Sequence, residues 1–180
     1  MEPIEPLDRT FRHAQRVIAG ITPNQYDNVT PCSEWNVRQV LEHAMGVVAG
    51  MGQALVGAQR TEFVLADDPG HQFEQIASDA IAAWRADGVL DQVVNFGAGP
   101  MPGRVYANIN LLDTATHTWD LAVATGQDAT LPDDVAVAAY EASQMIVSPE
   151  IRTGRFGAEV AAPADADPTQ RLVAFLGRTP

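Results

Sequence analysis

The sequence contains no lysine, a single cysteine, and no apolar run long enough to cross a membrane. Its 11 basic side chains, all arginine, face 23 acidic ones, so the formal net charge is −12. Nucleic acids and anionic lipid surfaces bind mainly through Lys and Arg, so we expect the chain to bind neither nucleic acid nor membrane. A membrane-spanning helix needs about 20 apolar residues, and the apolar stretches here, such as 47–51, are far shorter.

Cysteine content and the amino terminus indicate the compartment. Cys32 has no second cysteine to pair with, which excludes an internal disulfide. The first residues, MEPIEPLDRT, have neither the basic start nor the apolar stretch of a signal peptide. We therefore expect a cytoplasmic protein.

The hydrophobic pattern predicts an all-α fold. Apolar residues recur at helical spacing over 6–20, 37–58, 73–84 and 105–125, and a further helix is expected after Thr130. Asn36 with Gln39 forms a capping box for the second helix, and Gly126 ends the fourth. Residues 89–96 suit a short strand or an extended arm, and 97–103 are expected to be loop.

Four long amphipathic helices without alternating strand patterns predict a helical bundle. We expect this bundle to occupy residues 1–147 and a short C-terminal extension, 148–180, to pack on it. The extension is rich in Gly, Pro and Ala until Asp167, where a last helix is expected to begin. An exposed face of such a bundle would also suit a homodimer.

The predicted helix at 105–125 carries an unusual polar stripe. Its only formally charged side chains are Asp113 and Asp120, and at 100° per residue they share one narrow face with Tyr106, Asn110 and His117. This face adjoins the apolar arc of the helix, where an unpaired charge would be too costly to bury. The stripe therefore needs a metal ion, a cationic partner or a raised pKa.

Three residues of this pattern can hold a divalent metal. Asp113 and His117 stand four residues apart, so both side chains can reach one ion. His43 lies on the second predicted helix, where Gly46 and Gly50 would leave room beside its ring. If the two helices face each other, the set has two histidines and one carboxylate with open positions, as in catalytic sites.

Simpler interpretations remain open at this stage. His43 could be a hydrogen-bonded core residue, and Asp113 with His117 could be a plain hydrogen bond. Asp120 could cap a helix, pair with an arginine such as Arg38, or accept a proton from the far ring nitrogen of His117. Cys32 is expected to be structural, and the two remaining histidines, His13 and His71, are expected to face solvent.

Three segments resemble a known family. They are TPCSEWNVRQVLEHAMG at 30–46, DTATHTWDLAVATGQ at 113–127 and RFGAEVAAPADADPTQRLVAFLGRTP at 155–180. Together they resemble an actinobacterial DinB-like metal-binding family related to the metal-binding domain of mycothiol-dependent maleylpyruvate isomerase. The resemblance implies a DinB-like up-and-down four-helix bundle whose metal is held by His43, Asp113 and His117.

The resemblance also has two departures. The isomerase carries an additional C-terminal domain that contributes to its active site, whereas only a short tail follows the bundle here. Its acidic ligand is glutamate, and Asp113 is one methylene shorter. The resemblance therefore implies metal binding more directly than isomerisation of maleylpyruvate.

Our leading expectation is a metal-dependent enzyme, S-transferase or isomerase-like, that uses mycothiol or another low-molecular-weight thiol on a small electrophile. Zn²⁺ is the first candidate for the ion, with Ni²⁺ or Fe²⁺ as alternatives, and mycothiol is the candidate co-substrate. The alternatives are a non-catalytic metal-binding or ligand-sensing bundle and a hydrolase with a metal-activated water.

Overall fold

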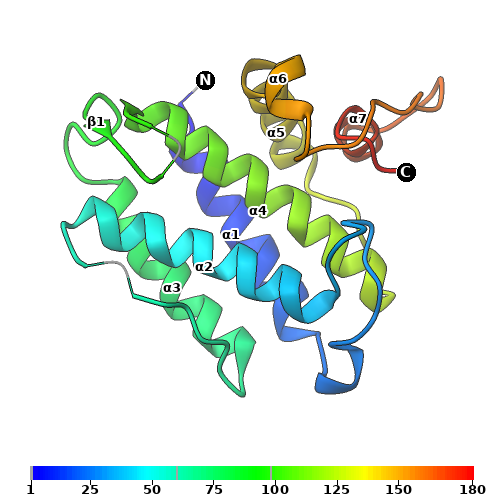
Figure 1. The fold of residues 1–180 in the computed structure, drawn as a ribbon, viewed down its shortest axis with the longest axis horizontal. Helices are drawn as coiled ribbons and strands as arrows, with labels where there is room; N and C mark the ends of the chain where they lie inside the picture. Colours follow the sequence, from blue (N-terminus) through cyan, green and yellow to red (C-terminus); the bar gives the residue numbers. More distant parts are fainter. Residues whose placement is uncertain (1, 60, 98) are drawn as a thin grey trace.

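The computed structural model describes residues 2–59, 61–97 and 99–180, whose regular secondary structure is almost entirely helical (Figure 1). The expected all-α bundle is confirmed. Its elements are α1 Ile4–Ala19, the 3-10 turn η1 Pro23–Gln25, α2 Val37–Leu55, α3 Pro69–Trp84, strands β1 Val93–Val94 and β2 Met101–Pro102, α4 Gly103–Thr125, α5 Asp133–Ile146, α6 Pro149–Arg152 and α7 Pro168–Phe175. Among the described residues, no helix has the length and apolar content that a bilayer span requires.

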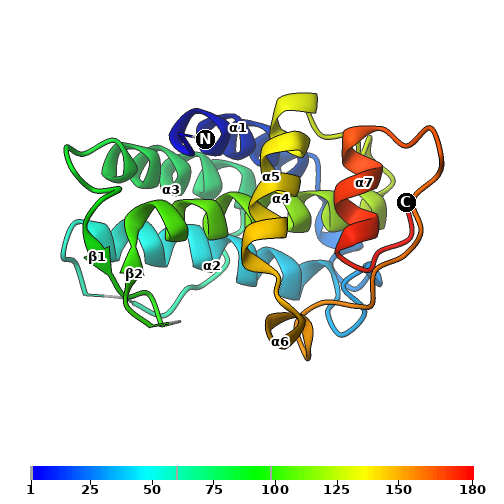
Figure 2. The same cartoon turned by 90° about the horizontal axis from the view of Figure 1, so that it is seen from above.

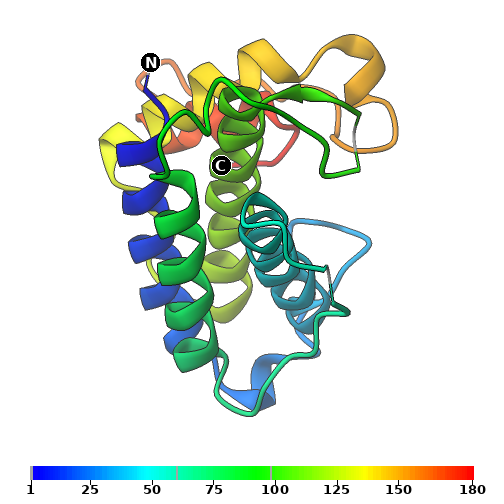
Figure 3. The same ribbon diagram turned by 90° about the vertical axis from the view of Figure 1, so that its left-hand side faces the viewer.

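Helices α1 to α4 form the bundle. Both α1 and α2 pack against α3 and α4, which places α1 and α2 on one diagonal of the bundle (Figure 3). The helices do not simply alternate in direction. The start of α3 packs against the end of α1, at Gly70 and Ala19, whereas Gly52 and Ala80 bring the carboxyl halves of α2 and α3 together. The chain on either side of residue 60, at 56–59 and 61–68, runs back along the bundle and so lets α2 and α3 run parallel.

Helices α5 and α7 lie side by side and cross α4 on one face of the bundle (Figure 2). The Leu131 backbone N–H, just before α5, donates to the Thr169 hydroxyl of α7 at 3.1 Å. Leu172 and Leu176 are fully buried in the common core. The expected extension, 148–180, therefore returns the end of the chain to α4.

Local sequence signals explain most helix ends. Asn36 and Gln39 form the expected capping box of α2, and Gly126 adopts φ 71° at the end of α4, a left-handed conformation that favours glycine. Asp167 caps α7 as expected. Helix α3 begins earlier than its apolar periodicity, at Pro69, because the Asp68 side chain accepts the backbone N–H of His71.

The expectation that 97–103 is all loop is wrong. Met101 and Pro102 form β2, which pairs antiparallel with Val94 and Val93 of β1. Between the strands, Gly99 has φ 102°, a conformation that few other residues adopt, and this lets the chain fold back. Pro102 lies on an edge strand, where its missing N–H leaves no ladder bond unmade.

The expectation that His13 faces solvent is also wrong, whereas His71 is exposed as expected. His13 is 9% exposed, because Ala14 and Val17 beside it turn this side of α1 toward the core. Its Nδ1 lies 3.1 Å from an Arg16 amino group. Burial, and next the Arg16 charge, lower the pKa of His13 below its ordinary value.

A buried histidine with a lowered pKa makes the unfolded state bind protons first on acidification. The stability that depends on a neutral His13 is fully present above the pKa of the unfolded state. It is lost as the pH falls from that value toward the lower pKa of the folded state. We expect His13→Gln to lose less unfolding free energy than wild type between about pH 7.5 and pH 5.5. Urea unfolding at the two pH values measures this. Equal losses in both proteins would show that His13 does not contribute.

Candidate metal centre

Helix α4 is buried over most of its surface although it carries a polar stripe. Asn110 and Asp120 are fully buried, His117 is 8% exposed, and the Asp113 side chain keeps 21% exposure. Nearby threonine hydroxyls are satisfied within the helix, as where Thr118 Oγ1 donates to the Thr114 carbonyl at 2.7 Å. The stripe predicted from the sequence therefore lies inside the molecule, and its charged groups face partners on other segments.

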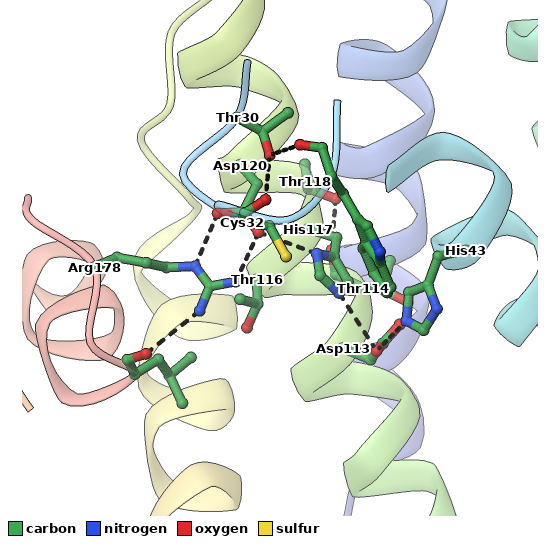
Figure 4. A network of polar contacts seen from close by, with 12 residues as sticks. Thr30, Cys32, His43, Asp113, Thr114, Thr116, His117, Thr118, Asp120 and Arg178 are labelled. Atoms are coloured by element: carbon green, nitrogen blue, oxygen red, sulfur yellow. Dashed lines mark hydrogen bonds and ion pairs between the residues drawn. The ribbon is translucent and has the colours of Figure 1, made fainter. Parts of the chain in front are cut away.

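Packing of α2 on α4 brings His43 to Asp113 and His117 (Figure 4). One carboxylate oxygen, Asp113 Oδ1, lies 3.1 Å from His43 Nε2 and 3.7 Å from His117 Nε2. The three side chains offer ligand atoms that all lie within 4.8 Å of one another. The rings of His43 and His117 are nearly perpendicular, with centroids 5.0 Å apart.

The geometry of these three side chains suits a divalent cation. Ligand atoms of a tetrahedral Zn²⁺ site, at about 2.1 Å from the ion, lie roughly 3.4 Å apart, close to the two distances found. Asp113 Oδ2 is buried and has no hydrogen-bond partner within the described chain. A buried carboxylate oxygen without a partner is costly, and a cation bound there would compensate it.

His117 is held from its other side by Asp120. Its Nδ1 lies 3.0 Å from Asp120 Oδ2, while Arg178 donates to both Asp120 oxygens, Nε to Oδ1 and Nη2 to Oδ2, each at 2.8 Å. Asp120 thus pairs with Arg178 and not with Arg38, which pairs instead with Glu42, one turn away on α2. The tail that carries Arg178 returns to α4, whereas Arg38 points to solvent.

These contacts set the ionisation of the buried groups. Burial opposes a charge on Asp120, but the hydrogen bonds from Arg178 and His117 outweigh it and lower its pKa. Burial likewise opposes a charge on His117, whose pKa is nevertheless raised by Asp113 and Asp120. The contacts therefore favour an ionised Asp120, held between Arg178 and His117.

The loop before α2 covers the two imidazoles. Val29 and Asn36 form an isolated bridge that closes the loop, and the Thr30 hydroxyl hydrogen-bonds the carbonyls of Cys32 and Trp35 at 3.1 and 2.7 Å. The loop thereby places the half-buried Trp35 ring 4.6 Å from the ring of His43. The indole shields one side of the candidate ligands from water.

Cys32 lies near the same histidine but on the opposite side from Asp113. Its sulfur, a His117 nitrogen and an Asp120 oxygen also lie within 4.8 Å of one another. His117 Nδ1 and both Asp120 oxygens are already engaged, however, and burial, with Asp120 next, raises the pKa of the Cys32 thiol. A metal ligand must be a thiolate, so this cluster suits an ion poorly and favours a structural role for Cys32.

Two residues of the site were not anticipated from spacing. Trp35 and Arg178 both lie in the motif segments quoted above, and Arg178 follows a buried apolar run, a place where an isolated charge signals a buried partner. The room expected beside Gly46 is absent, because Phe63 packs there, with its Cβ 3.3 Å from where a Gly46 Cβ would lie.

The chain is similar in sequence to a known domain family and to two mycobacterial proteins. The family model for the mycothiol maleylpyruvate isomerase N-terminal domain matches residues 7–122. Two uncharacterized proteins, from two strains of Mycobacterium tuberculosis, are 30% identical over 187 residues, which cover 99% of this chain and 99% of each relative. Their near-equal length shows that the C-terminal segment belongs to proteins of this type.

Crystal structures of the mycothiol-dependent maleylpyruvate isomerase and of a mutant are similar at 15% identity and a TM-score of 0.49. The similarity covers 75% of this chain and 65% of that chain, so this chain spans less than two thirds of the isomerase. Because the family model covers more than half of the chain, the protein belongs to the mycothiol maleylpyruvate isomerase N-terminal domain family.

Proposed function

We propose that the protein is a metal-dependent enzyme that uses a low-molecular-weight thiol, with mycothiol as first candidate, to conjugate or isomerise a small electrophile. The observation that carries the proposal is the convergence of His43, His117 and Asp113, whose second oxygen is buried without a hydrogen-bond partner among the described residues. Mycothiol enters through the family, whose description names a mycothiol-dependent isomerase.

The three ligand residues have separate roles. His43 and His117 would bind through Nε2 and Asp113 through its carboxylate, and three protein ligands leave at least one coordination position for a substrate. A divalent ion held there lowers the pKa of a coordinated thiol and so supplies a thiolate at neutral pH. Zn²⁺ suits this donor set, and Ni²⁺ or Fe²⁺ would accept the same ligands.

Surrounding residues orient the ligands and limit access. Asp120 accepts a hydrogen bond from the Nδ1–H group of His117 and so directs the Nε2 lone pair toward Asp113. The Trp35 ring covers both imidazoles, with centroids 4.6 and 5.8 Å away. A thiol would therefore approach from the side of the half-exposed His43 and Asp113.

The test begins with protein purified without a metal-affinity tag. We expect about one divalent ion per chain, and faster adduct formation between mycothiol and a panel of small electrophiles than with chelator-treated protein. As a control, His71→Ala removes an exposed histidine outside the site, and it should keep both the bound ion and the wild-type adduct rate. Equal adduct rates with loaded and metal-free protein would overturn the proposed activity.

A second candidate function is a non-catalytic metal-binding or ligand-sensing bundle. It is favoured by the position of the ligands on two helices, His43 on α2 and Asp113 with His117 on α4, because an ion there would crosslink the bundle. Stoichiometric metal without adduct formation would support this candidate. Metal-dependent hydrolysis of a small ester in the absence of thiol would support a metal-activated water instead.

A further inference from the structure

Arg178, two residues before Pro180, lies against the carboxyl-terminal half of α4. Its side chain is 9% exposed, and it engages Asp120, which is fully buried, through two hydrogen bonds of 2.8 Å (Figure 4). Such a parallel fork between guanidinium and carboxylate fixes the orientation of the carboxylate as well as its charge. Asp120 therefore cannot rotate freely about its side-chain bonds.

The fixed carboxylate in turn determines what His117 can do. Asp120 Oδ2 accepts from Arg178 and lies 3.0 Å from His117 Nδ1. An ionised carboxylate only accepts hydrogen bonds, so His117 Nδ1 must carry a proton to satisfy this contact. The neutral ring then has its lone pair on Nε2, the nitrogen that faces Asp113 across 3.7 Å.

We propose that Arg178 is a positioning residue of the candidate metal centre: by fixing Asp120, it sets the ring orientation and tautomer of His117. This inference rests on the proposed function, because it assigns the tail a role at the same site. It makes residues 168–178 part of the centre. Binding of an ion at His117 and docking of the tail on α4 then stabilise each other, since coupling between two sites is reciprocal.

The competing explanation is that Arg178 merely anchors the tail. Arg152 supplies the matched comparison, because it also holds the tail but does not touch Asp120. Its Nη1 donates to the carbonyls of Gly157 and Phe175 at 2.8 and 2.9 Å, and its guanidinium lies 4.9 Å from the Phe175 ring. Loss of Arg152 would loosen the tail near α7 and leave the contact between Asp120 and His117 in place.

The experiment compares wild type with Arg178→Gln, Arg178→Lys and Arg152→Gln. We expect Arg178→Gln to weaken Zn²⁺ binding by about 10- to 100-fold, as loss of a residue behind a metal ligand typically does. Arg178→Lys should restore part of the affinity, since it keeps the charge and loses the fork. Arg152→Gln should lower the melting temperature and leave the Zn²⁺ affinity within about threefold of wild type.

Two further measurements do not depend on a loaded enzyme. ¹⁵N NMR of metal-free wild type, recorded at a pH where the His117 ring is neutral, should show its single ring proton on Nδ1, and Arg178→Gln should lose this preference. If Arg178→Gln does not fold, hydrogen exchange on wild type replaces it: Zn²⁺ should slow exchange at residues 168–178 and leave exchange in the two strands, 93–94 and 101–102, unchanged.

The outcomes separate this inference from the proposed function. If wild type and Arg178→Gln bind Zn²⁺ equally well, the positioning role alone is overturned. Equal losses of affinity in Arg178→Gln and Arg152→Gln also overturn it, because they reduce the effect to tail docking. A wild type that binds no divalent ion overturns the proposed function, and the positioning role with it.

Discussion

Asp120→Asn is expected to lower the unfolding free energy of the metal-free protein by about 3 to 5 kcal/mol, the usual cost of breaking a buried ion pair. The substitution leaves the Arg178 guanidinium, 9% exposed, without its counter-charge. It also places an amide donor where only acceptors fit, between the donors of Arg178 and His117. Urea unfolding followed by circular dichroism in the presence of a chelator measures the loss.

The matched control is Glu42→Gln, which removes the acidic partner of an exposed pair with Arg38 on α2. Such pairs contribute about 0.3 to 0.5 kcal/mol, so the control should differ little from wild type. Asp120→Asn combined with Arg178→Met should cost less than the two single substitutions together, because neither partner then leaves a buried charge. Similar losses in Asp120→Asn and Glu42→Gln would show that the buried pair contributes little to stability.

Features set by short-range sequence patterns could be predicted. Helical periodicity placed α4 and the polar stripe on it, because side chains at i, i+3 and i+4 share a face whatever the tertiary structure. The sequence therefore predicted that Asp113, His117 and Asp120 lie on one face of this helix. Capping likewise fixed the start of α2 at Asn36 and the end of α4 at Gly126.

Features that depend on contacts across the chain could not be predicted from spacing. The partner of Asp120 lies 58 residues away along the chain. Only the packing of α7 on α5 brings Arg178, which follows α7, to this carboxylate. Arg38 was the arginine that the sequence suggested as a partner, but it forms a local pair on α2. The position of His43 opposite Asp113 likewise required α2 and α4 to be neighbours in the bundle.

Unlike Asp120→Asn, Asp113→Asn should not lower the unfolding free energy of the metal-free protein, although both residues lie on one stripe of α4. Asp113 Oδ2 is buried and has no hydrogen-bond partner among the described residues, so at a pH where the His117 ring is neutral its charge is a cost in the metal-free protein. A neutral amide is cheaper to bury, and its oxygen can still accept from His43 Nε2, which lies 3.1 Å from Oδ1. We expect the unfolding free energy without metal to be unchanged or raised by up to about 1 kcal/mol.

Metal binding should respond in the other direction. Replacing a direct ligand should cost more than the 10- to 100-fold typical of residues behind a ligand, so we expect Zn²⁺ affinity to fall by more than about 100-fold. Zn²⁺ at 100 times its Kd should stabilise wild type by about 2.7 kcal/mol, and the same concentration should not stabilise Asp113→Asn. Thermal unfolding with and without Zn²⁺ measures both. If Asp113→Asn loses stability without metal and is still stabilised by Zn²⁺, Asp113 stabilises the fold and does not bind the metal.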